Sequence, residues 1–200
     1  MGKGTAAAPS FRTIGQLAQR CGHYCWLENQ LFALTGGAAT AAATAPGPDP
    51  HSEVRLFLSE SSAQHAALAA EWRARLPVRA GVDADALVVP PPGPAGDALA
   101  LLAAAEDPLA VLGGLVQHIW PWLFGTYQDH LADAPAVSEA PVRAVLELAC
   151  FWGGRRLSVG LALLQRAMGG AADVARVADL DARLQRLLGE ESIFPAAQAS

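Results

Sequence analysis

Residues 77–97, PVRAGVDADALVVPPPGPAGD, constrain the fold of this chain more than any other segment. They are rich in Pro, Gly and short apolar residues, and they separate two pairs of long segments with helical periodicity. Two antiparallel helices need only a few residues to join them. A connection of about twenty residues can instead run the full height of a helical bundle, so that the third helix begins at the far end. The spacing therefore predicts a bundle with one long crossover between its second and third helices.

Apolar residues at three- and four-residue spacing predict four long helices and one short C-terminal helix. The third helix is expected in two pieces, because Asp107-Pro108 is a typical helix start, and Pro121 should kink the second piece. The expected ranges are 11–35 (ended by Gly36-Gly37), 52–76, 97–106, 108–133, 139–168 and 173–188. The fold class is therefore all-α. We expect a disordered lead over residues 1–10, one helical-bundle domain over 11–188 and a flexible tail over 189–200.

The composition is apolar for a chain of this size. Of the 200 residues, 52% are hydrophobic and only 16% are charged, and the mean hydropathy is +0.24. Such a helical protein has more apolar surface than one bundle core needs, which predicts a homodimer interface or a ligand pocket. The net charge of −5, with Lys3 as the sole lysine, argues against a nucleic-acid partner.

The sequence also bears on location. Three cysteines form no even disulfide framework and fit a reducing compartment. No signal-peptide core is visible near the first residue, and no run of eighteen uncharged apolar residues exists to span a bilayer. We therefore expect a cytoplasmic protein with no membrane association.

Four long helices with a crossover between the second and third resemble the ferritin-like superfamily. The resemblance covers residues 11–168 and is one of architecture. In metal-binding members, two helices each supply a Glu and two supply Glu-x-x-His. Here Glu28 takes the place of the first Glu, but Ser62 stands three residues before His65, and Cys150 stands three residues after Glu147. Both Glu-x-x-His motifs are broken, which argues against an intact di-iron site.

Several polar side chains interrupt the apolar stripes of the predicted helices. Glu28, His65 and Arg156 are the ionisable ones, and Tyr24 and Tyr127 fall on inward stripes as well. A few polar groups in an apolar lining are typical of a small-molecule pocket. The alternatives are structural: Glu28 could pair internally with Arg156, and His65 could be a hydrogen-bonded core histidine.

These residues predict a metal-independent ferritin-like protein that binds or transforms an apolar small molecule, in specialised-metabolite biosynthesis. Glu28 and His65 are the expected acid–base pair, and no cofactor is expected. Whether the chain is an enzyme stays open. The expected substrate contacts are Tyr24, Trp72, Trp120, Tyr127 and Arg156.

Two other functions compete with this prediction. One is a degenerate iron-dependent oxidase or oxygenase with Glu28, His65, Glu147 and His118 as ligands. The other is a non-enzymatic interaction module, in which the surplus apolar surface forms a homodimer.

Overall fold

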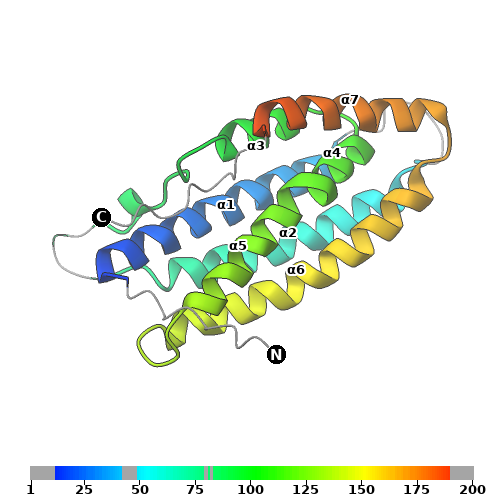
Figure 1. Ribbon diagram of the computed structural model, residues 1–200. Coiled ribbons are helices and arrows are strands. Elements are labelled where there is room, and N and C mark those ends of the chain that lie inside the picture. The colour runs from blue at the N-terminus through cyan, green and yellow to red at the C-terminus, as the bar shows by residue number, and fades with distance from the viewer. Residues whose placement is uncertain (1–11, 42–48, 79–80, 82, 190–200) are drawn as a thin grey trace, which may run out of the picture.

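The computed structural model describes residues 12–41, 49–78, 81 and 83–189, and every regular element among them is helical (Figure 1). This confirms the all-α class. The predicted lead, residues 1–10, and all of the predicted tail except Gly189 lie outside the described residues. The elements are α1 (Ile14–Thr40), α2 (Ser52–Arg73), the 3-10 turn η1 (Asp85–Leu87), α3 (Ala95–Ala103), α4 (Pro108–Gly114), the π-helical turn η2 (Leu115–Ile119), α5 (Trp120–Asp133), α6 (Ala140–Ala167) and α7 (Ala171–Leu188).

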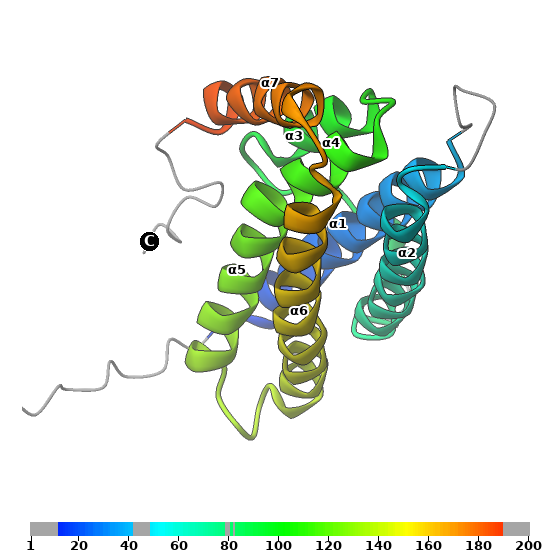
Figure 2. The same cartoon turned by 90° about the vertical axis from the view of Figure 1, so that its right-hand side faces the viewer.

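The four long helices form two antiparallel hairpins, α1 with α2 and α5 with α6, and α7 lies across one end over α3 and α4 (Figures 1 and 2). Helices α2 and α5 run in the same direction, because the chain from the end of α2 returns along the bundle before α5 begins. The apolar core lies between the hairpins, and its largest fully buried side chains include Trp72, Tyr24 and Leu146.

No helix in the described part of the chain is both long and apolar enough to cross a membrane.

The crossover is docked on α1 and is more than a spacer. The backbone of Leu87 lies so close to Gly22 that a Cβ at position 22 would overlap the Leu87 carbonyl group. The neighbouring His23 places its Nδ1 3.0 Å from the carbonyl oxygen of Val89. Further along, Pro91 is buried. A glycine in the middle of α1 thus lets the connection between the hairpins pass directly over the helix.

The predicted end of the first helix at Gly36-Gly37 is wrong, because α1 continues to Thr40. Gly36 lies against α2, where an added Cβ would meet the Ser62 hydroxyl at 3.1 Å. The small residue therefore serves close packing between the two helices. The start is also later than predicted: Thr13 caps the helix by a reciprocal pair of hydrogen bonds with Gln16.

The third long helix is interrupted as predicted, but by a different local structure at the proline. Asp107 accepts a hydrogen bond from the Leu109 amide at 2.9 Å, so α4 begins at Pro108. Before Pro121 the chain forms the π-helical turn η2, in which the Trp120 amide donates to the Leu115 carbonyl. Pro121 has no amide proton to donate, and its ring crowds the turn before it. The wider π-helical turn relieves this crowding.

Replacing Gly22 by Ala tests the docking of the crossover. The added methyl group meets backbone rather than a flexible side chain, so we expect the free energy of unfolding to fall by about 1–3 kcal/mol. Gly37→Ala is the matched control in the same helix, because nothing lies within 4 Å of its Cβ position. It should raise the free energy of unfolding by up to about 1 kcal/mol through helix propensity. Urea unfolding measures both, and equal effects of the two substitutions would show that the crossover is not held on α1.

Candidate functional site

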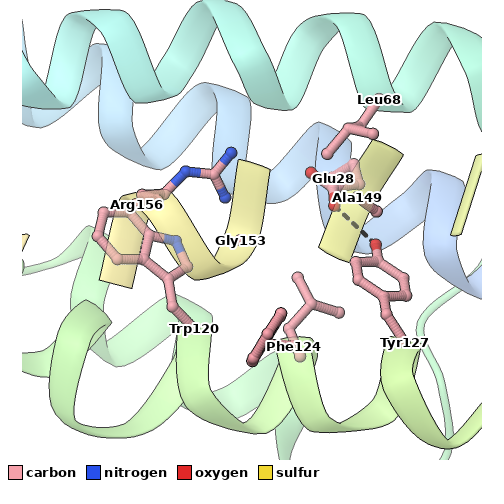
Figure 3. A pocket seen from close by; sticks show the side chains of 9 residues that line it. Glu28, Leu68, Trp120, Phe124, Tyr127, Ala149, Gly153 and Arg156 are labelled. Atoms are coloured by element: carbon pink, nitrogen blue, oxygen red, sulfur yellow. Dashed lines mark hydrogen bonds between the residues drawn. The ribbon is translucent and has the colours of Figure 1, made fainter. Parts of the chain in front are cut away.

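Glu28 is the polar centre of the bundle. Its side chain is 0% exposed, in the middle of α1, and each carboxylate oxygen accepts one hydrogen bond. Oε1 accepts from the Tyr127 hydroxyl of α5 at 2.6 Å, and Oε2 accepts from His65 Nδ1 of α2 at 2.5 Å (Figure 3 shows the Tyr127 bond). Three helices therefore meet at one buried carboxylate.

The second nitrogen of His65 fixes its tautomer. The indole N–H of Trp120 can only donate, and it lies 3.2 Å from His65 Nε2. Nε2 must therefore be the acceptor, and the ring proton must sit on Nδ1, where it is donated to Glu28. Burial lowers the pKa of His65, Arg156 lowers it further and Glu28 opposes both, so the ring is neutral at pH 7. Both ring nitrogens are already engaged.

Arg156 is the buried cation of the same region. It comes from α6, is 5% exposed and stacks its guanidinium over the Trp120 ring at 5.3 Å. One terminal nitrogen donates to Gln64 Oε1 at 3.1 Å, whereas the buried Nε has no hydrogen-bond partner among the residues that the structure describes. Burial lowers the pKa of Arg156, and the nearby Glu28 and Tyr127 oppose the shift. Among the described residues Arg156 forms no ion pair, so the alternative of a direct Glu28–Arg156 pair is wrong.

A small cavity separates these charged groups. Figure 3 shows the Arg156 guanidinium reaching toward Glu28 among apolar side chains. The cavity has a free volume of ≈10 Å³, which is room for the centre of about one water molecule. The lining residues are Glu28, Leu68, Trp120, Leu123, Phe124, Tyr127, Ala149, Gly153 and Arg156.

Phe124 closes one side of this cavity by packing on the glycine pair of α6. A Cβ at Gly153 would lie 3.0 Å from the Phe124 ring, and one at Gly154 would lie 3.6 Å from it. Phe124 is only partly buried. The two glycines in mid-helix therefore make room for an aromatic ring, at a cost in helix propensity of about 1 kcal/mol each.

The seven predicted site residues fall into three groups. Four of them line the cavity: Glu28, Trp120, Tyr127 and Arg156. His65 reaches it only through its bond to Glu28. The other two, Tyr24 and Trp72, lie behind Tyr127, with ring centroids 4.9 and 5.8 Å from that of Tyr127, and do not line the cavity.

A second buried network was not predicted from the sequence. Tyr24 accepts from Arg20 Nε at 3.0 Å, and its hydroxyl lies 3.1 Å from His130 Nδ1. His130 Nε2 lies 3.2 Å from a carboxylate oxygen of Glu139, and Arg12 reaches the other oxygen at 3.6 Å. Burial, with Arg20 and Arg12 nearby, lowers the pKa of His130 to about 3. The sequence feature that could have predicted this network is the three-residue spacing between Tyr127 and His130, which places His130 on the same inward face of α5.

The predicted alternative set of iron ligands does not assemble. His118 bonds Asp181 of α7 at 2.6 Å, and Glu147 has a side chain 62% exposed and paired with Arg143. His65 Nε2 accepts from Trp120 and Nδ1 donates to Glu28, so neither ring nitrogen is free to ligate a metal. Within the described ranges no three His, Cys, Asp or Glu side chains are placed to hold a metal ion. The residues present do not fit iron.

His65 and His130, the two histidines that are 0% exposed, predict a loss of stability in acid. Both are neutral in the folded protein, whereas each takes up a proton near pH 6.5 once unfolded. Lowering the pH below 6.5 therefore favours the unfolded chain, by about 1.4 kcal/mol per pH unit for each histidine, until the folded-state pKa is reached. Urea unfolding between pH 7 and pH 5 measures this slope. His130→Gln should make the slope shallower by roughly 1 kcal/mol per pH unit, and an unchanged slope would contradict the buried neutral state.

Glu28→Gln tests the carboxylate centre. The substitution turns one of the two carboxylate oxygens into an NH₂ group, which then faces the hydrogen-bond donor of His65 or Tyr127. Because one buried hydrogen bond is lost, we expect the free energy of unfolding to fall by about 1–3 kcal/mol. Glu147→Gln is the matched control on the surface and should change stability by no more than about 0.5 kcal/mol. Equal stability of the two variants would mean that the hydrogen bonds at Glu28 do not hold the helices together.

Comparison of the chain with family models, with curated proteins and with solved structures finds no match. The ferritin-like resemblance therefore stands on helix order and crossover length alone, and the site stands on its own geometry.

Proposed function

We propose that this chain is a metal-independent, ferritin-like bundle that binds an apolar small molecule in its interior, between α1, α2, α5 and α6. One observation carries the proposal: Arg156, a residue of the cavity wall, holds a buried Nε–H that has no partner within the described part of the chain. An unsatisfied buried donor costs about 1–3 kcal/mol. A polar group on a bound ligand would remove that cost.

The lining of the cavity supports an apolar ligand. Leu68, Leu123, Phe124 and Ala149 contribute only carbon atoms from their side chains, and Gly153 adds none. A mostly apolar wall with a few polar groups is typical of small-molecule sites. A ligand larger than a water molecule must displace Phe124, and the glycines beneath that ring leave it without side chains to lock it in place on α6.

The polar residues take distinct roles in this proposal. Arg156 and Glu28 contact the ligand, because both face the cavity. His65 and Tyr127 hold the Glu28 carboxylate in place and are positioning residues. If the ligand is transformed as well as bound, proton transfer runs through Glu28, since both nitrogens of His65 are engaged. The setting we propose is a cytoplasmic step of specialised metabolism, consistent with free cysteines at Cys21, Cys25 and Cys150.

The homodimer expected from composition stays a prediction. On α6 the apolar side chains of Phe151, Val159 and Leu161 are exposed, at 65%, 46% and 42%.

Toluene and p-cresol are suitable first probes, followed by the NMR signals of the Trp120 indole N–H and the Arg156 Nε–H. We expect saturable shifts of both signals for at least one probe at millimolar concentration. Gly153→Leu fills the cavity and should weaken binding tenfold or more, and Gly153→Ala, which adds only a methyl group 3.0 Å from Phe124, should weaken it less. Gly37→Leu, at an open position on α1, is the control that should bind as the unaltered protein does. The proposed function would be overturned if neither probe showed saturable binding. It would also be overturned if Gly153→Leu bound a probe as tightly as the unaltered protein does.

A further inference from the structure

We infer that the ligand of this cavity is a neutral molecule with a hydroxyl group, a phenol or an alcohol, whose oxygen accepts from the Arg156 guanidinium and whose proton is donated to Glu28. The inference rests on the proposed function and names the chemical class that the site selects. Hydrogen-bond capacity, size and charge all lead to it.

The hydrogen-bond capacities of the two charged groups are opposite. A guanidinium has donors only, and among the described residues the buried Arg156 Nε–H has no acceptor. A carboxylate has acceptors only, and each Glu28 oxygen accepts a single bond, from Tyr127 or His65. Each oxygen keeps a second lone pair. A group between Arg156 and Glu28 must therefore accept on one side and donate on the other. An ether or carbonyl oxygen can only accept, whereas a hydroxyl group does both.

The free volume agrees with a single oxygen atom at this point. The cavity of ≈10 Å³ has room for about one water molecule, which has the same donor and acceptor capacity as a hydroxyl group. With the hydroxyl oxygen in this volume, the apolar body of the ligand takes the space on the side of Phe124. Phe124 is the one partly exposed aromatic ring of the lining, because Trp120 and Tyr127 are buried.

The charges that face the cavity disfavour ionised ligands. Arg156 contributes one positive charge and Glu28 one negative charge, while His65 is neutral. Tyr127 remains protonated, because burial and Glu28 raise its pKa well above the usual value. A carboxylate ligand would be attracted by Arg156 but repelled by Glu28. An ammonium ligand would be attracted by Glu28 but repelled by Arg156. A neutral hydroxyl group can hydrogen-bond to both Arg156 and Glu28 without being repelled by either.

The larger surface groove elsewhere lacks such a free group. It has a volume of ≈410 Å³ between α4 and α7. Its Arg176 already pairs with Asp107 at 2.7 Å and with Asp173 at 2.5 Å. No unsatisfied buried donor or acceptor is found among its described lining residues. The interior cavity is thus the better-defined site.

Four ligands of similar shape test the inference on the full chain: toluene, 4-methylanisole, p-toluate and p-cresol. Toluene has no polar group, 4-methylanisole has an acceptor only, p-toluate is an anion and p-cresol has a hydroxyl group. We expect p-cresol to bind at least tenfold more tightly than each of the other three by calorimetry or NMR titration. Arg156→Met should reduce p-cresol to the affinity of toluene, whereas Arg155→Met, at the adjacent exposed position, should leave it unchanged.

The outcomes separate this inference from the proposed function. Equal affinity for all four ligands would overturn the hydroxyl inference and leave interior binding intact. Tighter binding of p-toluate or of 4-methylanisole would overturn it in favour of an anion or of a simple acceptor. Binding of none of the four would remove the proposed function itself. The order of the four affinities, measured on the unaltered protein, tests the inference even if Arg156→Met fails to fold.

Discussion

The buried carboxylate of Glu28 is the interaction on which the interior depends. A charged group removed from water is costly unless it is hydrogen-bonded, and here it accepts from Tyr127 and His65 across three helices. Those bonds fix the rotation of α1, α2 and α5 about their axes. His65 is in turn held by Trp120, whose ring also supports the Arg156 guanidinium. The position of the free buried donor, Arg156 Nε, depends on this sequence of contacts.

Helical periodicity was sufficient to predict that four polar residues point inward. Glu28, His65, Tyr127 and Arg156 interrupt apolar stripes, and each is buried. A side chain at three- and four-residue spacing shares the face of its neighbours whatever the tertiary structure. The same reasoning located the breaks at Pro108 and Pro121, since proline acts on its own helix.

Which residues meet across the core could not be predicted in the same way. A direct pair of Glu28 with Arg156 was one alternative, but Glu28 bonds His65 and Tyr127. The choice of partner depends on how far each helix is shifted along its neighbour. Gly36 was read as a helix end for a similar reason: only the position of Ser62 shows that it serves packing. Glu139 was overlooked because it precedes α6 in a turn, where an acidic residue is usually solvated, and its burial depends on His130 and Arg12.

The interior differs in chemical terms from the metal-binding ferritin-like pattern. The resemblance implies a Glu and a His converging on an ion inside the bundle. In this chain Glu28 and His65 contact each other directly, and the second histidine nitrogen accepts from an indole. Groups that could ligate a metal are therefore used as hydrogen-bond partners, which leaves a neutral interior with one cation and one anion beside a small cavity.

The protonation of His65 is the most direct test of this arrangement. Long-range ¹H–¹⁵N NMR at pH 7 distinguishes the two neutral tautomers of a histidine from its cation. The hydrogen bonds require a neutral ring with its proton on Nδ1 and an unprotonated Nε2. A proton on Nε2, either alone or together with Nδ1, would contradict the arrangement, because Nε2 could then not accept from Trp120.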